Sequence, residues 1–200
     1  MRLFPRRLVT IFSFAIICVG CATRGEPTPS PDTAQAASFR DELSPPTDVP
    51  ELDARVVPPL GWTVEPTVEN SNRHTQTVWV SPSGGTAYGV IHFTLPLPVG
   101  EEIALRGFLA EMKRHEGEAR LLSKNREGDR LRFVAEGGKY RIRGILLTKA
   151  FQGWAVYAGT LRSRSPAVDE LALAVQAREN TALGLEADGK KLQTLTSKSP

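Results

Sequence analysis

The clearest hydrophobic pattern in the chain is the alternation of apolar and polar positions between residues 130 and 162. Alternation of this kind predicts strands with one buried face. Turn residues interrupt it twice, first at Gly137-Gly138 and then at residues 150–153. Glycine accepts the positive φ that a two-residue hairpin turn needs. The pattern therefore predicts three consecutive antiparallel strands joined by two tight turns.

The register that these turns imply places arginines opposite one another on one face. Centring the first turn on Gly137-Gly138 puts Arg132 opposite Arg143, and the second turn sets Arg162 across from Arg141. Like charges directly opposite each other in a sheet are destabilising, so an anion is expected to compensate them. Two explanations stay open: pairing with the internal carboxylates Asp169, Glu170, Glu136 or Glu127, or an anion-binding patch formed by Arg132, Arg141, Arg143 and Arg162.

Further strands and two helices surround this meander. Short alternating segments predict strands at 62–65, 75–80, 88–95 and 119–124. Acidic residues at the start, basic residues at the end and the following Gly117 predict a helix from Glu101 to Glu116. Ser165 as N-cap and Pro166 at the first helical position predict a second helix. The fold class is α+β, one antiparallel sheet of about six strands flanked by two helices.

This order of elements resembles the PsbP-like fold, that of the extrinsic photosystem II protein. The resemblance is carried by the residues Pro58-Pro59-Leu60-Gly61-Trp62 and by the segments VWVSPSGGTAYGVIHF, YRIRGILL and GWAVYAGTL, with a helix in between and another at the end. It covers residues 56–182 and implies a non-catalytic accessory or binding domain. It assigns no functional residue, because it is a pattern of elements without a diagnostic motif.

Residues 1–20 form an export signal. Three arginines precede the apolar run Leu8–Val19, which is too short for a membrane span of about 20 residues. A small residue, Gly20, then precedes Cys21. This resembles the bacterial lipoprotein signal, which implies fatty acyl chains such as palmitate on Cys21, although Cys18 stands where leucine is usual. The alternative is an ordinary signal cut nearby, for which Ala22 is the candidate small residue.

The remaining chain divides by composition into three parts. Residues 21–55 read as a lipid-anchored disordered linker, because they are polar, rich in proline and without sustained apolar periodicity. Residues 56–185 form the domain, and residues 186–200 form a flexible tail. We therefore expect a lipid-anchored protein of the bacterial cell envelope, on the outer side of the cytoplasmic membrane, facing the periplasm or the exterior.

The balance of charged residues and the positions of the cysteines limit the kinds of partner that the sequence predicts. The chain has 25 bases and 22 acids, and removal of Arg2, Arg6 and Arg7 with the signal leaves 22 of each. This balance gives no reason to expect nucleic acid. Both cysteines lie at the signal, so the mature domain contains no disulfide. The expected partners are the membrane, through lipid on Cys21, and an envelope protein or anionic envelope polymer.

Candidate catalytic chemistry is sparse. The histidines His74, His92 and His115 have no metal-ligand spacing with another His, Cys or carboxylate, and no nucleophile motif is present. The sequence therefore predicts no catalytic residue, no metal, no cofactor and no enzyme. Two other functions stay open. One is a pocket for a lipid or other small ligand between sheet and helix, lined by Trp62, Trp79 and Trp154. The second is a hydrolase, for which no candidate set of residues exists.

Overall fold

A computed structural model describes residues 40–70, 74–165 and 167–184 of the chain. The predicted signal segment 1–20, the predicted lipid-attachment residue Cys21 and the predicted tail 186–200 lie outside the described residues. Within the described part, no helix is long and apolar enough to cross a membrane.

Most of the strands form one antiparallel sheet in the order β3-β4-β5-β9-β8-β7-β6, and a small sheet has the order β1-β2-β10. The prediction of a single sheet of about six strands is therefore wrong in number: the main sheet has seven strands and a three-stranded sheet accompanies it. The elements are η2 Arg40–Glu42, β1 Thr47–Val49, η3 Pro50–Leu52, β2 Ala54–Val56, β3 Thr63–Asn70, β4 His74–Val80, β5 Thr86–Thr94, α1 Glu101–Glu116, β6 Ala119–Glu127, β7 Arg130–Gly137, β8 Tyr140–Lys149, β9 Gln152–Leu161, α2 Val168–Asn180 and β10 Ala182–Leu183.

The two helices differ in how closely they match the sequence signals. Helix α1 has the predicted bounds, and Gly117 ends it in the left-handed conformation with φ 79°. Its buried apolar residues are Ala104, Leu105, Phe108 and Met112. Helix α2 begins at Val168 with Ala167 as its N-cap. The prediction of Ser165 as the N-cap is therefore wrong: α2 begins without a side-chain cap, and its first turn is held by hydrogen bonds from Ser83 to Glu170.

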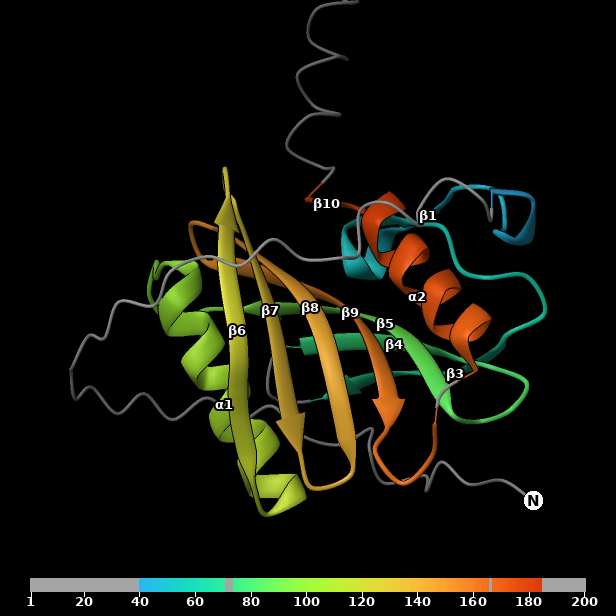
Figure 1. Cartoon of the computed structure of the whole chain (residues 1–200). Coiled ribbons are helices and arrows are strands. Elements are labelled where there is room, and N and C mark those ends of the chain that lie inside the picture. Colours follow the sequence, from blue (N-terminus) through green and yellow to red (C-terminus); the bar gives the residue numbers. More distant parts are fainter. Residues whose placement is uncertain (1–39, 71–73, 166, 185–200) are drawn as a thin grey trace, which may run out of the picture.

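Each helix covers half of the main sheet, and the two lie on opposite faces (Figure 1). Helix α1 packs against β6, β7 and β8, over a core that includes Phe133, Leu146 and Tyr157. Helix α2 packs mainly against β5 and β9, over a core that includes Tyr88 and Trp154. Among the described residues, the α2-side face of β6 and β7 therefore has no helix over it.

The small sheet extends the ordered chain into the range expected to be linker. Strand β1 pairs with β2, and β10, which follows α2, pairs with β2 on its other side. Leu43 bridges to Pro59 and packs against the core beneath α2. Trp154 Nε1 donates a hydrogen bond to the Leu52 carbonyl at 3.0 Å, which joins the small sheet to the main sheet. Residues 40–55 therefore belong to the folded part, in contrast to the linker range 21–55 expected from composition.

The meander has the predicted faces but a shifted register. Glu136 lies opposite Arg141, with the first turn centred on Gly138-Lys139, and the second turn is Ala150-Phe151. Both shifts are even, so each side chain keeps its face, but Arg132 lies opposite Ile145 and not Arg143. Contact with α1 explains the first turn: a Cβ on Gly138 would lie 2.6 Å from the Glu116 carbonyl oxygen.

Candidate anion-binding surface

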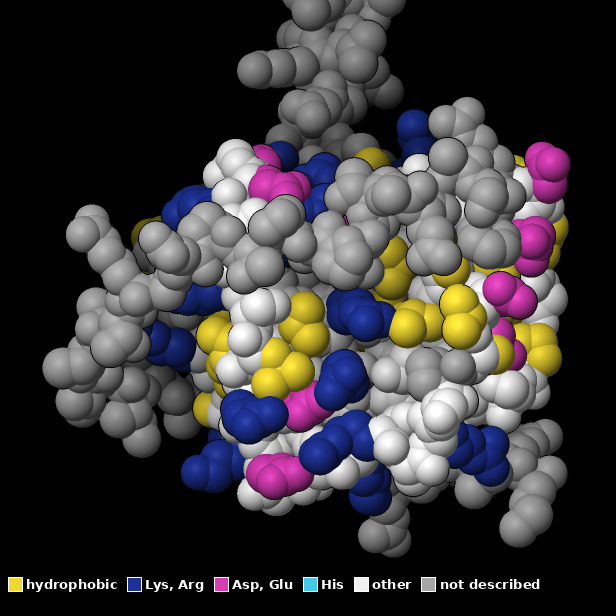
Figure 2. Space-filling view, viewed as in Figure 1, with side chains coloured by type: hydrophobic (Ala, Val, Ile, Leu, Met, Phe, Trp, Pro, Cys, Tyr) yellow, Lys and Arg dark blue, Asp and Glu magenta, His cyan; other side chains and the backbone are white. Residues whose placement is uncertain are grey.

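The uncovered half of the sheet carries a cluster of arginines, which we call the arginine surface. Register places side chains of β6, β7 and β8 on the α2 side of the sheet, and Arg162 follows directly after β9. Figure 2 shows basic side chains spread over this part of the molecule with a few acidic ones among them, and a row of acidic side chains along the right edge of the view. The arginine surface consists of Arg120, Arg130, Arg132, Arg141, Arg143 and Arg162.

One group of these arginines surrounds the buried carboxylate of Glu136. Arg141 Nε donates to Glu136 Oε1 at 2.6 Å, and Arg120 lies 3.5 Å from Glu136 Oε2. Arg162 donates to the Gly137 carbonyl at 2.6 Å and to Glu118 at 2.9 Å. The hydrogen bond from Arg141 lowers the pKa of Glu136, and the charges of Arg141, Arg162 and Arg120 lower it further against the opposing effect of burial. Glu136 is therefore ionised and holds this group together.

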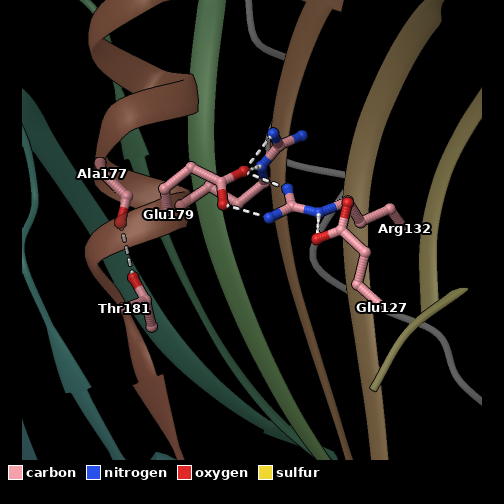
Figure 3. Close-up of polar contacts among 6 residues, drawn as sticks. Glu127, Arg132, Ala177, Glu179 and Thr181 are labelled. Carbon is pink, nitrogen blue, oxygen red and sulfur yellow. Dashed lines mark hydrogen bonds and ion pairs between the residues drawn. The ribbon is translucent and has the colours of Figure 1, made fainter. Parts of the chain in front are cut away.

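A second group forms where the sheet meets the end of α2 (Figure 3). Arg132 donates to both carboxylate oxygens of Glu179, with Nη2 to Oε2 at 2.6 Å, and its Nε donates to Glu127 at 2.7 Å. Arg178 Nη2 donates to Glu179 Oε1 at 2.6 Å. Burial raises the pKa of Glu179, but the hydrogen bonds and charges of Arg132 and Arg178 outweigh it, so the pKa is lowered. The same pairing raises the pKa of Arg132, chiefly through Glu179.

Two arginines of the surface form no ion pair: Arg143 lies between the two groups, and Arg130 lies beyond Arg132 at the start of β7. Arg143 is opposite Val134 on one side and Ala158 on the other, and Arg130 is opposite Glu127 and Leu147. Within the described part of the chain, neither guanidinium makes a hydrogen bond or an ion pair. Six arginines thus meet four carboxylates, Glu118, Glu127, Glu136 and Glu179, and the surface keeps an excess of positive charge.

The structure brings the four predicted arginines onto one side of the meander but does not pair them as predicted. Arg141 forms a hydrogen bond with Glu136, and the charge of Arg162 also lowers the pKa of Glu136. Arg132 forms a separate ion pair with Glu179. Of the predicted internal carboxylates, Glu136 and Glu127 bind arginines of the surface. Glu170 instead binds Ser83 Oγ at 2.5 Å, away from the arginine surface.

Glu179 is the partner that sequence reasoning missed. It follows Leu171 and Val175 at intervals of four residues, so the helical repeat places it on the buried side of α2. That repeat is the signal that could have found it. The helix continues to Asn180, so Glu179 lies in its last turn, one helical repeat beyond Val175.

Other candidate chemistry is dispersed. No group of three or more His, Cys, Asp or Glu that could hold a metal occurs within the described ranges. His92 stacks on Trp154 with ring centroids 5.2 Å apart, and His115 Nε2 lies 2.8 Å from Glu111 on the same helix. Trp79 and Trp154 are buried in the core beneath α2, with Trp62 packed against it. Trp79 and Trp154 are therefore core side chains, and Trp62 is a partly buried neighbour of the same core.

We expect the substitution Arg132→Ala to lower the free energy of unfolding by about 2 kcal/mol, because it leaves a largely buried carboxylate without its principal partner. The side chains of Arg132 and Glu179 are only 29% and 27% exposed, so solvent screens the pair weakly. Urea denaturation at neutral pH measures the loss.

The loss of stability caused by Arg132→Ala should depend on pH in a direction that the pKa of Glu179 determines. Because the pKa of Glu179 is lowered in the folded state, its contribution is present above the unfolded carboxyl pKa, about 4.3, and is lost as the pH falls through the folded value. The difference in stability between the native protein and Arg132→Ala should therefore shrink below about pH 4. A difference that is constant down to pH 2.5, or no loss at neutral pH, would contradict the assignment.

Comparison with known proteins supports the fold. No family model matches the chain, and no curated protein matches it. The solution structure of cyanobacterial PsbP from Synechocystis is similar, with a TM-score of 0.50 and 14% sequence identity, over 74% of this chain and 95% of that one. A crystal structure from Bacteroides thetaiotaomicron has a TM-score of 0.35 at 11% identity, over 68% of this chain and 46% of that one, and carries no argument. The chain has a PsbP-like fold, as the resemblance in its sequence implied.

Proposed function

We propose that this chain is a non-catalytic accessory domain of the bacterial cell envelope. In this proposal, lipid on Cys21 tethers it to the outer side of the cytoplasmic membrane, and the arginine surface binds an anionic partner, an envelope protein or an envelope polymer. The PsbP-like fold supports an accessory role. The sequence of residues 1–21 supports the tether, because a charged start, a short apolar run and a small residue before Cys21 are typical of lipoprotein signals.

The excess positive charge of the arginine surface carries the binding part of the proposal. Arg130 and Arg143 form no ion pair with a carboxylate among the described residues, although Glu136 and Glu179 bind neighbouring arginines closely. Positive charge that the fold itself leaves uncompensated favours association with an oppositely charged surface. The strands hold these arginines side by side on one side of the sheet, which suits an extended or broad partner better than a small molecule enclosed on all sides.

The tether is tested by the substitution Cys21→Ser and cell fractionation. The native protein should remain with the membrane fraction, because two or more acyl chains make release negligible. The variant should move to the soluble fraction. A variant that stays wholly with the membrane would overturn the lipid anchor.

The binding surface is tested by crosslinking in intact cell envelopes with a matched pair of variants. Arg143→Ala should leave the free energy of unfolding within about 0.5 kcal/mol and should reduce the crosslinked partner. The crosslinking that remains should depend less on salt, because charge pairs across a surface are screened. The control is Arg106→Ala, since Arg106 is exposed on α1 and makes no bond within the described ranges. Equal crosslinking by the two variants would contradict the proposal.

A further inference from the structure

Three side chains in the middle of the arginine surface, Leu122, Val134 and Arg143, form what we call the central row. Leu121 packs against the core beneath α1, so alternation along β6 turns Leu122 toward the arginine surface. A β-bulge at this point sets Leu122 and the next residue opposite Val134, and Val134 lies opposite Arg143. Leu122 is 39% exposed and Val134 is half-buried, and neither belongs to the core beneath α1 or beneath α2. Figure 2 shows apolar side chains between the basic ones on this part of the molecule.

Arg143 brings a half-buried positive charge to the central row. Its neighbours across the strands are the apolar residues Val134 and Ala158, and within the described part of the chain it forms no hydrogen bond or ion pair. A charge that is partly withdrawn from water among apolar side chains is costly unless an anion accompanies it. The central row therefore offers two kinds of contact side by side, an apolar contact through Leu122 and an ionic contact through Arg143.

The two helices of the chain dock on the sheet through this same combination of contacts. Helix α1 buries its apolar stripe against β6, β7 and β8, and Glu101 in its first turn pairs with Arg126 of β6 at 2.8 Å. Helix α2 buries Val175 in the core beneath it, and Glu179 in its last turn pairs with Arg132 of β7. In both cases an apolar stripe covers apolar strand residues while a carboxylate near one end of the helix reaches an arginine of the sheet.

The uncovered part of the sheet has the width of one further helix. Among the described residues, no helix lies over this side of β6 and β7 (Figure 1). Neighbouring strands are about 4.8 Å apart, so about 10 Å separates β6 from β8, and a helix with its side chains is about 10 Å across. Helices that pack against each other lie about 8–10 Å apart. A helix beside α2, which packs mainly on β5 and β9, would therefore lie over β7 and β8.

We propose that the central row docks an acidic amphipathic helix of a partner protein. The inference rests on the proposed binding role of the arginine surface and deepens it, because it selects a protein over an envelope polymer. The apolar stripe of such a helix covers Leu122 and Val134, and an Asp or Glu beside the stripe pairs with Arg143. A uniformly charged polymer would gain nothing from the apolar pair. A partner strand added to β6 is disfavoured, because the bulge and the exposed cations Lys124 and Arg126 oppose pairing at this edge.

The test uses the full-length protein in intact cell envelopes, with a photoreactive phenylalanine in place of Asn125. Asn125 is exposed in β6, lies opposite Arg132 and follows Leu122 by three positions. We expect irradiation to give one discrete, protease-sensitive adduct with another protein. The crosslinked peptide of that protein should carry apolar residues at intervals of three and four positions with Asp or Glu beside them, the pattern of an acidic amphipathic helix.

Three substitutions, each combined with the photoreactive residue, test the contacts behind the adduct. Arg143→Ala and Leu122→Ala should each lower its yield by about tenfold, since one charge-assisted hydrogen bond or one covered leucine contributes about that much to binding. Arg106→Ala, on the exposed side of α1, is the control and should leave the yield unchanged. All three variants should keep the urea midpoint of the native protein, because these residues lie outside the cores beneath the two helices.

The outcomes separate this inference from the proposed function. A yield that falls with Arg143→Ala but not with Leu122→Ala, or an adduct of many sizes that resists protease, would indicate a polymer and overturn the inference alone. An adduct within this chain, or a crosslinked peptide without carboxylates, would also overturn the inference alone. A yield that Arg143→Ala does not lower, or no adduct at all, would overturn the proposed binding surface and the inference with it.

Discussion

The substitution Gly144→Ala is expected to lower the free energy of unfolding by about 3 kcal/mol or more, because overpacking a well-filled core is costly. A Cβ at this position would lie 2.3 Å from Phe133 Cζ. Phe133 is buried directly across the β7–β8 pair and packs edge-on against Phe108 of α1, with ring centroids 5.2 Å apart. Because the ring is buried and packed against Phe108, the core has to rearrange to admit the added Cβ.

Two other glycines stand in the same relation to an aromatic ring. Gly89 lies opposite Tyr157, and Gly153 lies opposite Phe93. A Cβ would come within 2.4 Å of the first ring and 2.3 Å of the second. All three rings belong to the core beneath α1. Glycine in a strand thus makes room for an aromatic side chain of the neighbouring strand.

The matched control is Gly159→Ala. Gly159 is buried in β9 like Gly153, but a Cβ there meets no atom closer than 3.8 Å. Because glycine weakens a strand interior by its greater freedom in the unfolded chain, this substitution should be neutral or slightly stabilising. Urea denaturation of Gly144→Ala and Gly159→Ala measures the free energy of unfolding of each variant. Equal stability of the two would refute the packing argument.

The second large effect is expected for Trp154→Ala, which should cost about 3–5 kcal/mol, as truncations of large buried aromatic residues do. Trp154 is only 1% exposed in the core beneath α2. It also donates the hydrogen bond that joins the main sheet to Leu52. Its loss should therefore loosen the small sheet in addition to creating a cavity.

The milder variant Trp154→Phe separates the loss of the hydrogen bond to Leu52 from the loss of packing in the core. It keeps much of the ring and removes the N–H, leaving the buried Leu52 carbonyl without its donor, for a loss of about 1–3 kcal/mol. Amide hydrogen exchange should rise in β1 and β2 more than in β8. If exchange in these strands is unchanged in both variants, the hydrogen bond does not secure the small sheet.

Local sequence patterns determined most of the elements. The alternation of residues 130–162 predicted three strands, and charges with Gly117 predicted the bounds of α1. Face assignments in the meander were also correct, because side chains alternate with a period of two and both register errors were even. These features depend on periodicity and turn chemistry, which a sequence displays directly.

Tertiary contacts decided the register and the charge pairs of the candidate site. The first turn moved to Gly138-Lys139 because Gly138 lies against the end of α1, a contact between segments more than 20 residues apart. The partner of Arg132 is Glu179, which lies 47 positions along the chain and reaches it only when α2 docks on the sheet. The small sheet arose from three short segments that bury apolar surface only together. The sequence by itself determined the strands of the main sheet, the two helices and the clustering of arginines in one stretch. Only the packed structure determined which arginines are neutralised, because ion pairs depend on distances that local patterns do not contain.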